Sequence, residues 1–175
     1  MRLALLASAL AGRRIDVAFA DAGTPSWTDR LTVFLDPDLA PREQIQAIAV
    51  QSGLLRAGSL DPVIAAALAR HFEVTARYLA IEGRRVLLAN DVPLPTAVLA
   101  LARTLDHETD SPAASLALAE GRGPVELAPS VFGQIRPRDL RQPPSTGHPV
   151  RSDQEASECV ALPPRELNEL VSDVL

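Results

Sequence analysis

The chain has 175 residues, 47% of them hydrophobic, and a formal net charge of −5, which suits one globular domain with an extension. The acidic balance argues against a general nucleic-acid binder, and no segment reaches the roughly 20 apolar residues that a membrane-spanning helix needs. The single cysteine, Cys159, excludes an intramolecular disulfide, so we expect a cytoplasmic protein.

The N-terminal part is predicted to hold one helix and a small β-hairpin. Residues 2–11 repeat leucines at helical spacing, whereas residues 14–20 alternate apolar and polar side chains with the period of a strand. Residues 31–35 are rich in strand formers, so a hairpin at about 14–35 is expected to pack on the helices. Trp27 lies in the predicted hairpin loop, either as a binding anchor or as a plug that closes one end of the helical block.

A helical block follows, and the rest of the chain is expected to pack against it. Apolar residues recur at three- and four-residue steps, Gly58 ends the first helix, and Asp61 with Pro62 forms a helix start. Thr96 is expected to cap a later helix. The predicted helices span residues 42–57, 62–70, 73–90, 96–105 and 112–120.

The C-terminal part changes composition. Residues 133–161 contain several prolines and charged residues with few apolar ones, which predicts a flexible Pro/Arg-rich linker. Residues 162–175 read as an amphipathic terminal helix, with Leu167, Leu170, Val171 and Val174 on one face. The predicted fold is therefore mainly α (α+β): a helical bundle with one β-hairpin in residues 1–132, then the linker and the terminal helix.

The sequence holds no complete catalytic motif of the zinc-protease, Walker or nucleophile-elbow kind. The three histidines lie far apart and show no metal-ligand spacing, and the helix where a zinc protease would carry H-E-x-x-H holds no histidine. The chain contains no lysine, so no Walker motif is possible, and it has no G-x-S-x-G. We expect a non-enzymatic protein without catalytic, cofactor-binding or metal residues; the alternative is a zincin-like hydrolase with atypical or lost ligands.

One charged pattern suggests a partner surface. Arg70, Arg77 and Arg84 repeat every seven residues and so share one face of a helix. They could form a basic stripe for an acidic partner, or a solvated face held by weak ion pairs. The partner-binding candidates are these three arginines, Trp27, and Leu167, Leu170 and Val171 of the terminal helix, which could dock in cis or mediate self-association.

Several short blocks together resemble the N-terminal region of NorD-like proteins over about residues 3–95. The blocks are LLASALAGRRIDVA, WTD, LTVFLD, AVQSGLLRAGSLDP and ARYLAIEGRR, in this order. NorD-like proteins are von Willebrand factor A (VWA) domain proteins, related in organisation to the CobT cobaltochelatase subunit and to CoxE-type proteins.

The resemblance implies a function in metalloenzyme activation or assembly. Family members pair with a MoxR-type AAA+ ATPase and carry a C-terminal VWA domain with a metal-ion-dependent adhesion site. The sequence given stops at Leu175, before such a domain, so its metal site is not carried over and no residue inherits a catalytic role. The expected function is a scaffold domain that binds a MoxR-type ATPase, a client metalloenzyme, or both; a self-associating regulatory protein is a further alternative.

Overall fold

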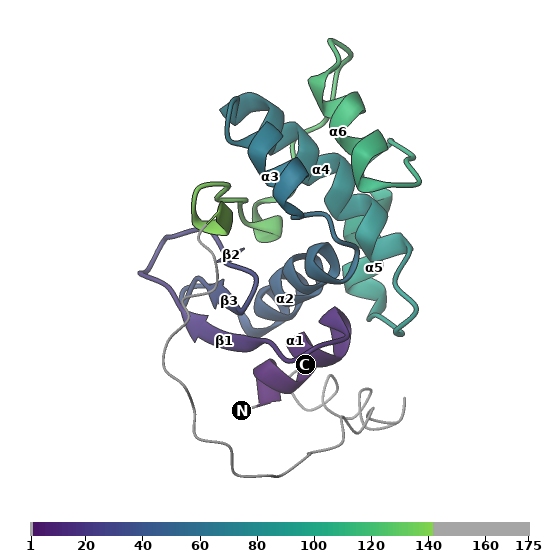
Figure 1. Ribbon diagram of the computed structural model, residues 1–175. Coiled ribbons are helices and arrows are strands. Elements are labelled where there is room, and N and C mark those ends of the chain that lie inside the picture. The colour runs from purple at the N-terminus through teal and green to yellow at the C-terminus, as the bar shows by residue number, and fades with distance from the viewer. Residues whose placement is uncertain (1, 142–175) are drawn as a thin grey trace.

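A computed structural model describes residues 2–141 of the chain. The predicted mainly helical fold is confirmed: residues 2–141 form six α-helices and a small sheet near the N-terminus (Figure 1). The helices are α1 (Arg2–Ala11), α2 (Pro41–Arg56), α3 (Pro62–Leu68), α4 (Phe72–Leu88), α5 (Thr96–Arg103) and α6 (Pro112–Glu120), followed by the 3-10 turns η1 (Ser130–Phe132) and η2 (Asp139–Arg141).

The helix starts follow local sequence chemistry, with one correction. Asp61 occupies the N-cap position of α3 and Pro62 its first turn, although the Asp61 side chain makes no capping hydrogen bond. The Ser111 hydroxyl accepts a hydrogen bond from the Ala114 amide at 3.2 Å and so caps α6. The prediction that Thr96 caps α5 is wrong, because Pro95 is at the N-cap and Thr96 is the first helical residue.

The sheet differs from the predicted hairpin. Strand β1 (Asp16–Phe19) pairs with β3 (Thr32–Leu35) in parallel, not antiparallel as expected, in the strand order β1-β3-β2. The antiparallel neighbour of β3 is the two-residue strand β2 (Trp27–Thr28), which lies within the predicted loop. Because β2 carries the chain back along β3, the chain enters β3 in the same direction as β1.

Helix α2 lies at the centre of the domain. Every residue from Ala47 to Leu54 is buried, so this helix is covered on all sides. It contacts α1, α4, β3 and η1, which surround it in Figure 1. Few aromatic residues are available, so the core is built mainly from Leu, Ile, Val and Ala side chains.

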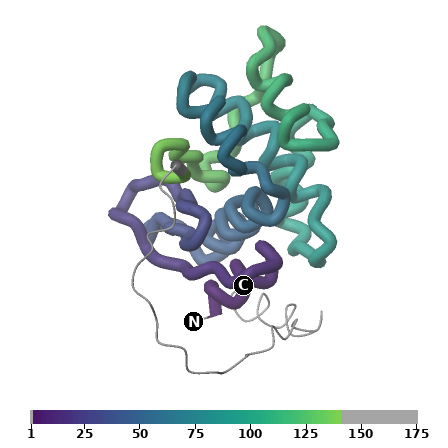
Figure 2. The backbone as a smooth tube through the Cα atoms, in the orientation of Figure 1, coloured from purple at the N-terminus to yellow at the C-terminus, as the bar shows by residue number. Residues whose placement is uncertain are grey.

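The ordered domain continues past residue 132, which corrects the predicted start of the linker at residue 133. Ile135 and Leu140 are buried in the same core as the helices. The Gln134 amide donates a hydrogen bond to the Ser26 carbonyl at 2.8 Å, and this segment returns beside the sheet and α3 (Figure 2). The remaining predicted linker and the predicted helix at 162–175 lie outside the described residues.

A buried carboxylate in α4 connects three segments of the fold. Glu82 is completely buried and accepts hydrogen bonds from the hydroxyls of Ser59 and Ser115. It also accepts two from Arg85, from Nε at 2.8 Å and from Nη2 at 2.5 Å. Ser59 lies in the α2–α3 turn and Ser115 lies in α6, so this cluster, here called the Glu82 network, fixes both segments against α4.

Two groups beside Glu82, the Tyr78 phenol and the Arg85 guanidinium, keep their protons. Burial, reinforced by the negative charge of Glu82, raises the pKa of Tyr78, so its phenol stays protonated and donates to the Ser59 carbonyl at 2.8 Å. The hydrogen bond to Glu82 raises the pKa of Arg85, which therefore keeps its positive charge. The carboxylate thus always faces a cation.

We predict that Glu82→Gln lowers the free energy of unfolding by about 3 kcal/mol, because it leaves the mostly buried Arg85 cation without its counter-charge. Gln has nearly the same shape as Glu, so the change removes charge and not volume. Urea denaturation measures the loss. Glu126→Gln, at an exposed position, is the matched control and should be neutral. Equal stability of the two variants would show that the Glu82 network contributes nothing net.

We also predict that Gly83→Ala destabilises the domain by about 1–3 kcal/mol. A Cβ at residue 83 would lie 2.6 Å from two ring carbons of Phe132, which is itself fully buried. Gly123→Ala is the control, since a Cβ there meets nothing within 4 Å. Thermal unfolding measures both, and adding Phe132→Leu should recover part of the loss in the Gly83 variant. No recovery would indicate that the Phe132 contact is not the cause.

Candidate functional site

The arginines of the predicted basic stripe do not share one helix face. Arg70 is exposed in the turn between α3 and α4, before the helix begins. Arg77 donates from Nε to the Ala119 carbonyl at 2.7 Å and from Nη2 to the Gly121 and Gly123 carbonyls at 2.7 and 2.9 Å. Arg77 therefore holds the C-terminal end of α6 against α4.

Arg84 has a similar structural contact on the same helix. Its Nε donates to the Leu105 carbonyl and its Nη1 to the His107 carbonyl, both at 2.6 Å. Its side chain is only 14% exposed, and Glu108 lies 3.8 Å from Nη2. Arg77 and Arg84 thus donate to backbone carbonyls of this chain, whereas Arg70 is exposed.

Trp27 is packed within the domain rather than presented as an isolated anchor. Its ring stacks on Phe34 with 4.2 Å between the centroids. The guanidinium of Arg136 lies 4.4 Å from the Trp27 centroid, a cation–π contact. Trp27 thereby joins the sheet to residues 133–140. The other predicted partner-binding residues, Leu167, Leu170 and Val171, lie outside the described residues.

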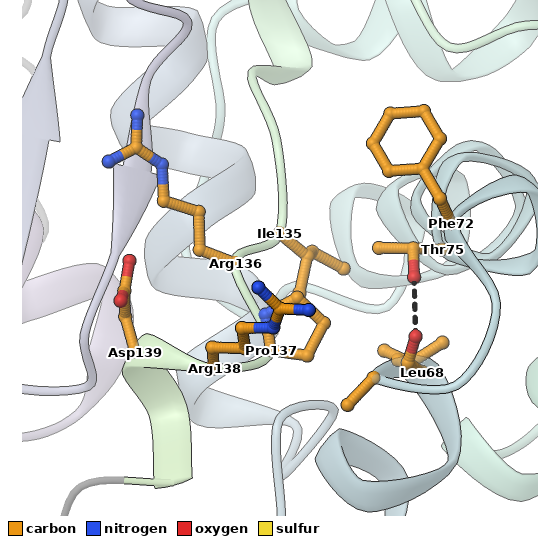
Figure 3. A pocket seen from close by; sticks show the side chains of 9 residues that line it. Leu68, Phe72, Thr75, Ile135, Arg136, Pro137, Arg138 and Asp139 are labelled. Carbon is orange, nitrogen blue, oxygen red and sulfur yellow. Dashed lines mark hydrogen bonds between the residues drawn. The ribbon is translucent and has the colours of Figure 1, made fainter.

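A pocket of about 430 Å³ lies between residues 135–139 and the junction of α3 and α4 (Figure 3). Leu68 and Ile135 are buried in its wall, whereas the Phe72 side chain is 86% exposed at its edge. We call it the Phe72 pocket. Its lining residues are Leu68, Ala69, Phe72, Thr75, Ile135, Arg136, Pro137, Arg138 and Asp139.

Local geometry explains why the Phe72 pocket is apolar inside and cationic at its rim. The Thr75 hydroxyl donates a hydrogen bond to the Leu68 carbonyl at 3.0 Å, shown as the dashed line in Figure 3, so this polar group already has a partner. Arg136 extends toward the sheet, where it contacts Trp27. Arg138 is exposed and makes no hydrogen bond or ion pair with the rest of residues 2–141.

The lining of the Phe72 pocket combines apolar surface with a few charged groups. It offers apolar surface, two guanidinium groups and one carboxylate, Asp139, without histidine or cysteine. Across residues 2–141, no group of three or more His, Cys, Asp or Glu side chains is placed to hold a metal ion. No helix in the same range is long and apolar enough to cross a membrane.

A second, smaller pocket of about 200 Å³ lies where α2 and α4 end. Its two arginines are already paired, Arg85 with Glu82 and Arg56 with Asp91 at 3.2 Å. The Asn90 amide nitrogen is buried there without a partner. Because both of its arginines are paired with carboxylates, the second pocket has no unpaired positive charge among its described lining residues for an acidic ligand, unlike the Phe72 pocket with Arg138.

Sequence reasoning missed the main residues of the Phe72 pocket. Phe72 directly precedes the helix predicted at 73–90, and Arg136 and Arg138 lie in the linker predicted at 133–161. The available signal was Ile135 and Leu140, two large apolar residues that interrupt a polar, proline-containing stretch. Their burial brings the arginines between them to the pocket.

Comparison with known proteins adds no assignment to this geometry. No family model, no curated protein and no solved structure matches the chain.

We predict that Arg77→Ala lowers the free energy of unfolding by about 1–3 kcal/mol, because it removes the charged donor from four backbone carbonyls at and just after the end of α6. Amide hydrogen exchange should rise in residues 115–121. Arg103→Ala, an exposed arginine at the end of α5, is the control. If Arg77→Ala is as stable as this control, Arg77 is not holding α6 and is available to a partner.

Proposed function

We propose that this chain is a non-enzymatic interaction domain and that the Phe72 pocket is its docking site for a partner protein. The observation that carries the proposal is the exposed Phe72 beside an apolar pocket with Arg138 at the rim. Protein-binding hot spots combine an aromatic or arginine anchor with a surrounding desolvated surface. The fitting partner segment carries apolar side chains flanked by carboxylates.

The resemblance to NorD-like proteins supplies the proposed partner. We infer a MoxR-type AAA+ ATPase, or the metalloenzyme that the pair activates or assembles, as the protein that docks here. The domain then contributes a rigid scaffold, and the ATPase supplies the energy for remodelling. Stoichiometric zinc bound to the purified protein would instead favour the hydrolase alternative.

We predict that Phe72→Ala and Arg138→Glu each weaken capture of the purified MoxR-type ATPase by about tenfold or more. Phe72→Ala removes apolar contact area, and Arg138→Glu reverses the charge at the rim. Both residues are exposed, so stability should change by less than about 0.5 kcal/mol. Binding is measured by biolayer interferometry at two salt concentrations, and the Arg138 variant should also lose part of the salt dependence.

Matched controls separate the pocket from general surface effects. Leu127→Ala removes an 81% exposed apolar side chain outside the pocket, and Arg122→Glu reverses an exposed charge outside it. Both should bind like the unmodified protein. If the ATPase binds all four variants equally well, the Phe72 pocket is not its docking site.

A further inference from the structure

The Phe72 pocket defines the chemistry of its occupant. Leu68 and Ile135 provide buried apolar walls, and the exposed Phe72 ring gains from being covered by further apolar side chains. Arg138 has no carboxylate partner among the described residues, so an acidic group placed beside it would gain a charge-assisted contact. The best occupant is therefore short, apolar on one side and acidic on the other.

The chain itself contains such a segment. Residues Arg165–Leu175 read RELNELVSDVL, with three acidic residues and one basic residue. The helical period puts Leu167, Leu170, Val171 and Val174 on one face, with the acidic residues Glu166, Glu169 and Asp173 outside that apolar set. Both the apolar face and the net negative charge complement the pocket.

The point at which the chain leaves the described domain also favours docking of Arg165–Leu175 in the Phe72 pocket. Asp139 lines the pocket and belongs to η2, so the chain leaves the described domain at the pocket itself. Residues 142–164 can span up to roughly 75 Å when extended, more than the distance needed to return to the pocket. A tether of this kind gives an effective concentration on the order of millimolar, so even weak docking is populated.

We propose that Arg165–Leu175 docks in the Phe72 pocket of its own chain and covers Phe72 until a partner displaces it. The inference rests on the proposed function, because it assigns to the same pocket an internal competitor for the partner. Docking in cis makes the site self-masking. A partner then has to present a segment of similar chemistry and bind more tightly than the tethered one.

Photo-crosslinking of the full chain tests this directly. A photoreactive phenylalanine analogue replaces Phe72, a position whose exposure tolerates the extra volume, and mass spectrometry locates the crosslinks. We expect them on residues 165–175. Replacing Leu170 and Val171 together by Glu should reduce them at least about tenfold, because it would bury unpaired charges. The same analogue at Leu127 is the control and should not reach this segment.

Isotope mixing separates docking in cis from docking between copies. Equal amounts of ¹⁴N- and ¹⁵N-labelled chains are illuminated together. Crosslinked peptide pairs that contain only one isotope support the proposal. Mixed pairs show that a second copy fills the pocket, which would overturn it. Crosslinks from residue 72 that avoid residues 165–175 would also overturn it.

Failure of this inference and failure of the proposed function give different results. If crosslinks avoid residues 165–175 while Phe72→Ala still weakens ATPase capture, the pocket is a partner site without an internal competitor. If the crosslinks form as expected but no pocket variant alters capture, the internal docking stands and the ATPase binds elsewhere. If both hold, the Leu170/Val171 double variant should capture more ATPase than the unmodified chain.

Discussion

The fold depends on how the buried Glu82 carboxylate is surrounded. A fully buried charge is tolerated only where a counter-charge and hydrogen-bond donors surround it. Arg85 supplies the counter-charge from the next turn of α4, while Ser59 and Ser115 bring donors from the α2–α3 turn and from α6. Moving either segment away from α4 would leave acceptor positions of Glu82 empty in a dry environment, so the arrangement is fixed by polar chemistry as well as by apolar packing.

Helix α4 links this core to the surface proposed for binding. Its inner face carries Glu82 and the tightly packed Gly83, and its flanks carry Arg77 and Arg84, which hold the segments after α6 and α5. Its first residue, Phe72, is exposed at the pocket. A partner at the pocket would therefore contact the same rigid element that organises the interior. That placement suits a scaffold, because docking requires little reorganisation of the domain.

Much of the helical architecture follows from local sequence, whereas the pairings between segments do not. The spacing of apolar residues and Pro62 located the helices closely, since these signals act within a few residues. Alternation in residues 14–20 and 31–35 identified strand character but not direction, which depends on how β2 returns the chain. The seven-residue repeat identified the arginines, but it could not show that their guanidinium groups donate hydrogen bonds to backbone carbonyls of distant segments. The Phe72 pocket was hidden because Ile135 and Leu140 become core residues only through contacts with remote parts of the chain.

The arginine contacts of α4 have a consequence for how the domain responds to its surroundings. All 17 basic residues of the chain are arginines, and a guanidinium stays charged throughout the pH range in which proteins fold. Backbone carbonyls do not titrate either. The hydrogen bonds that Arg77 and the Nε and Nη1 atoms of Arg84 donate to these carbonyls therefore do not depend on the protonation of either partner. These arginine contacts should therefore attach the segments at the ends of α5 and α6 to α4 equally well across cellular pH.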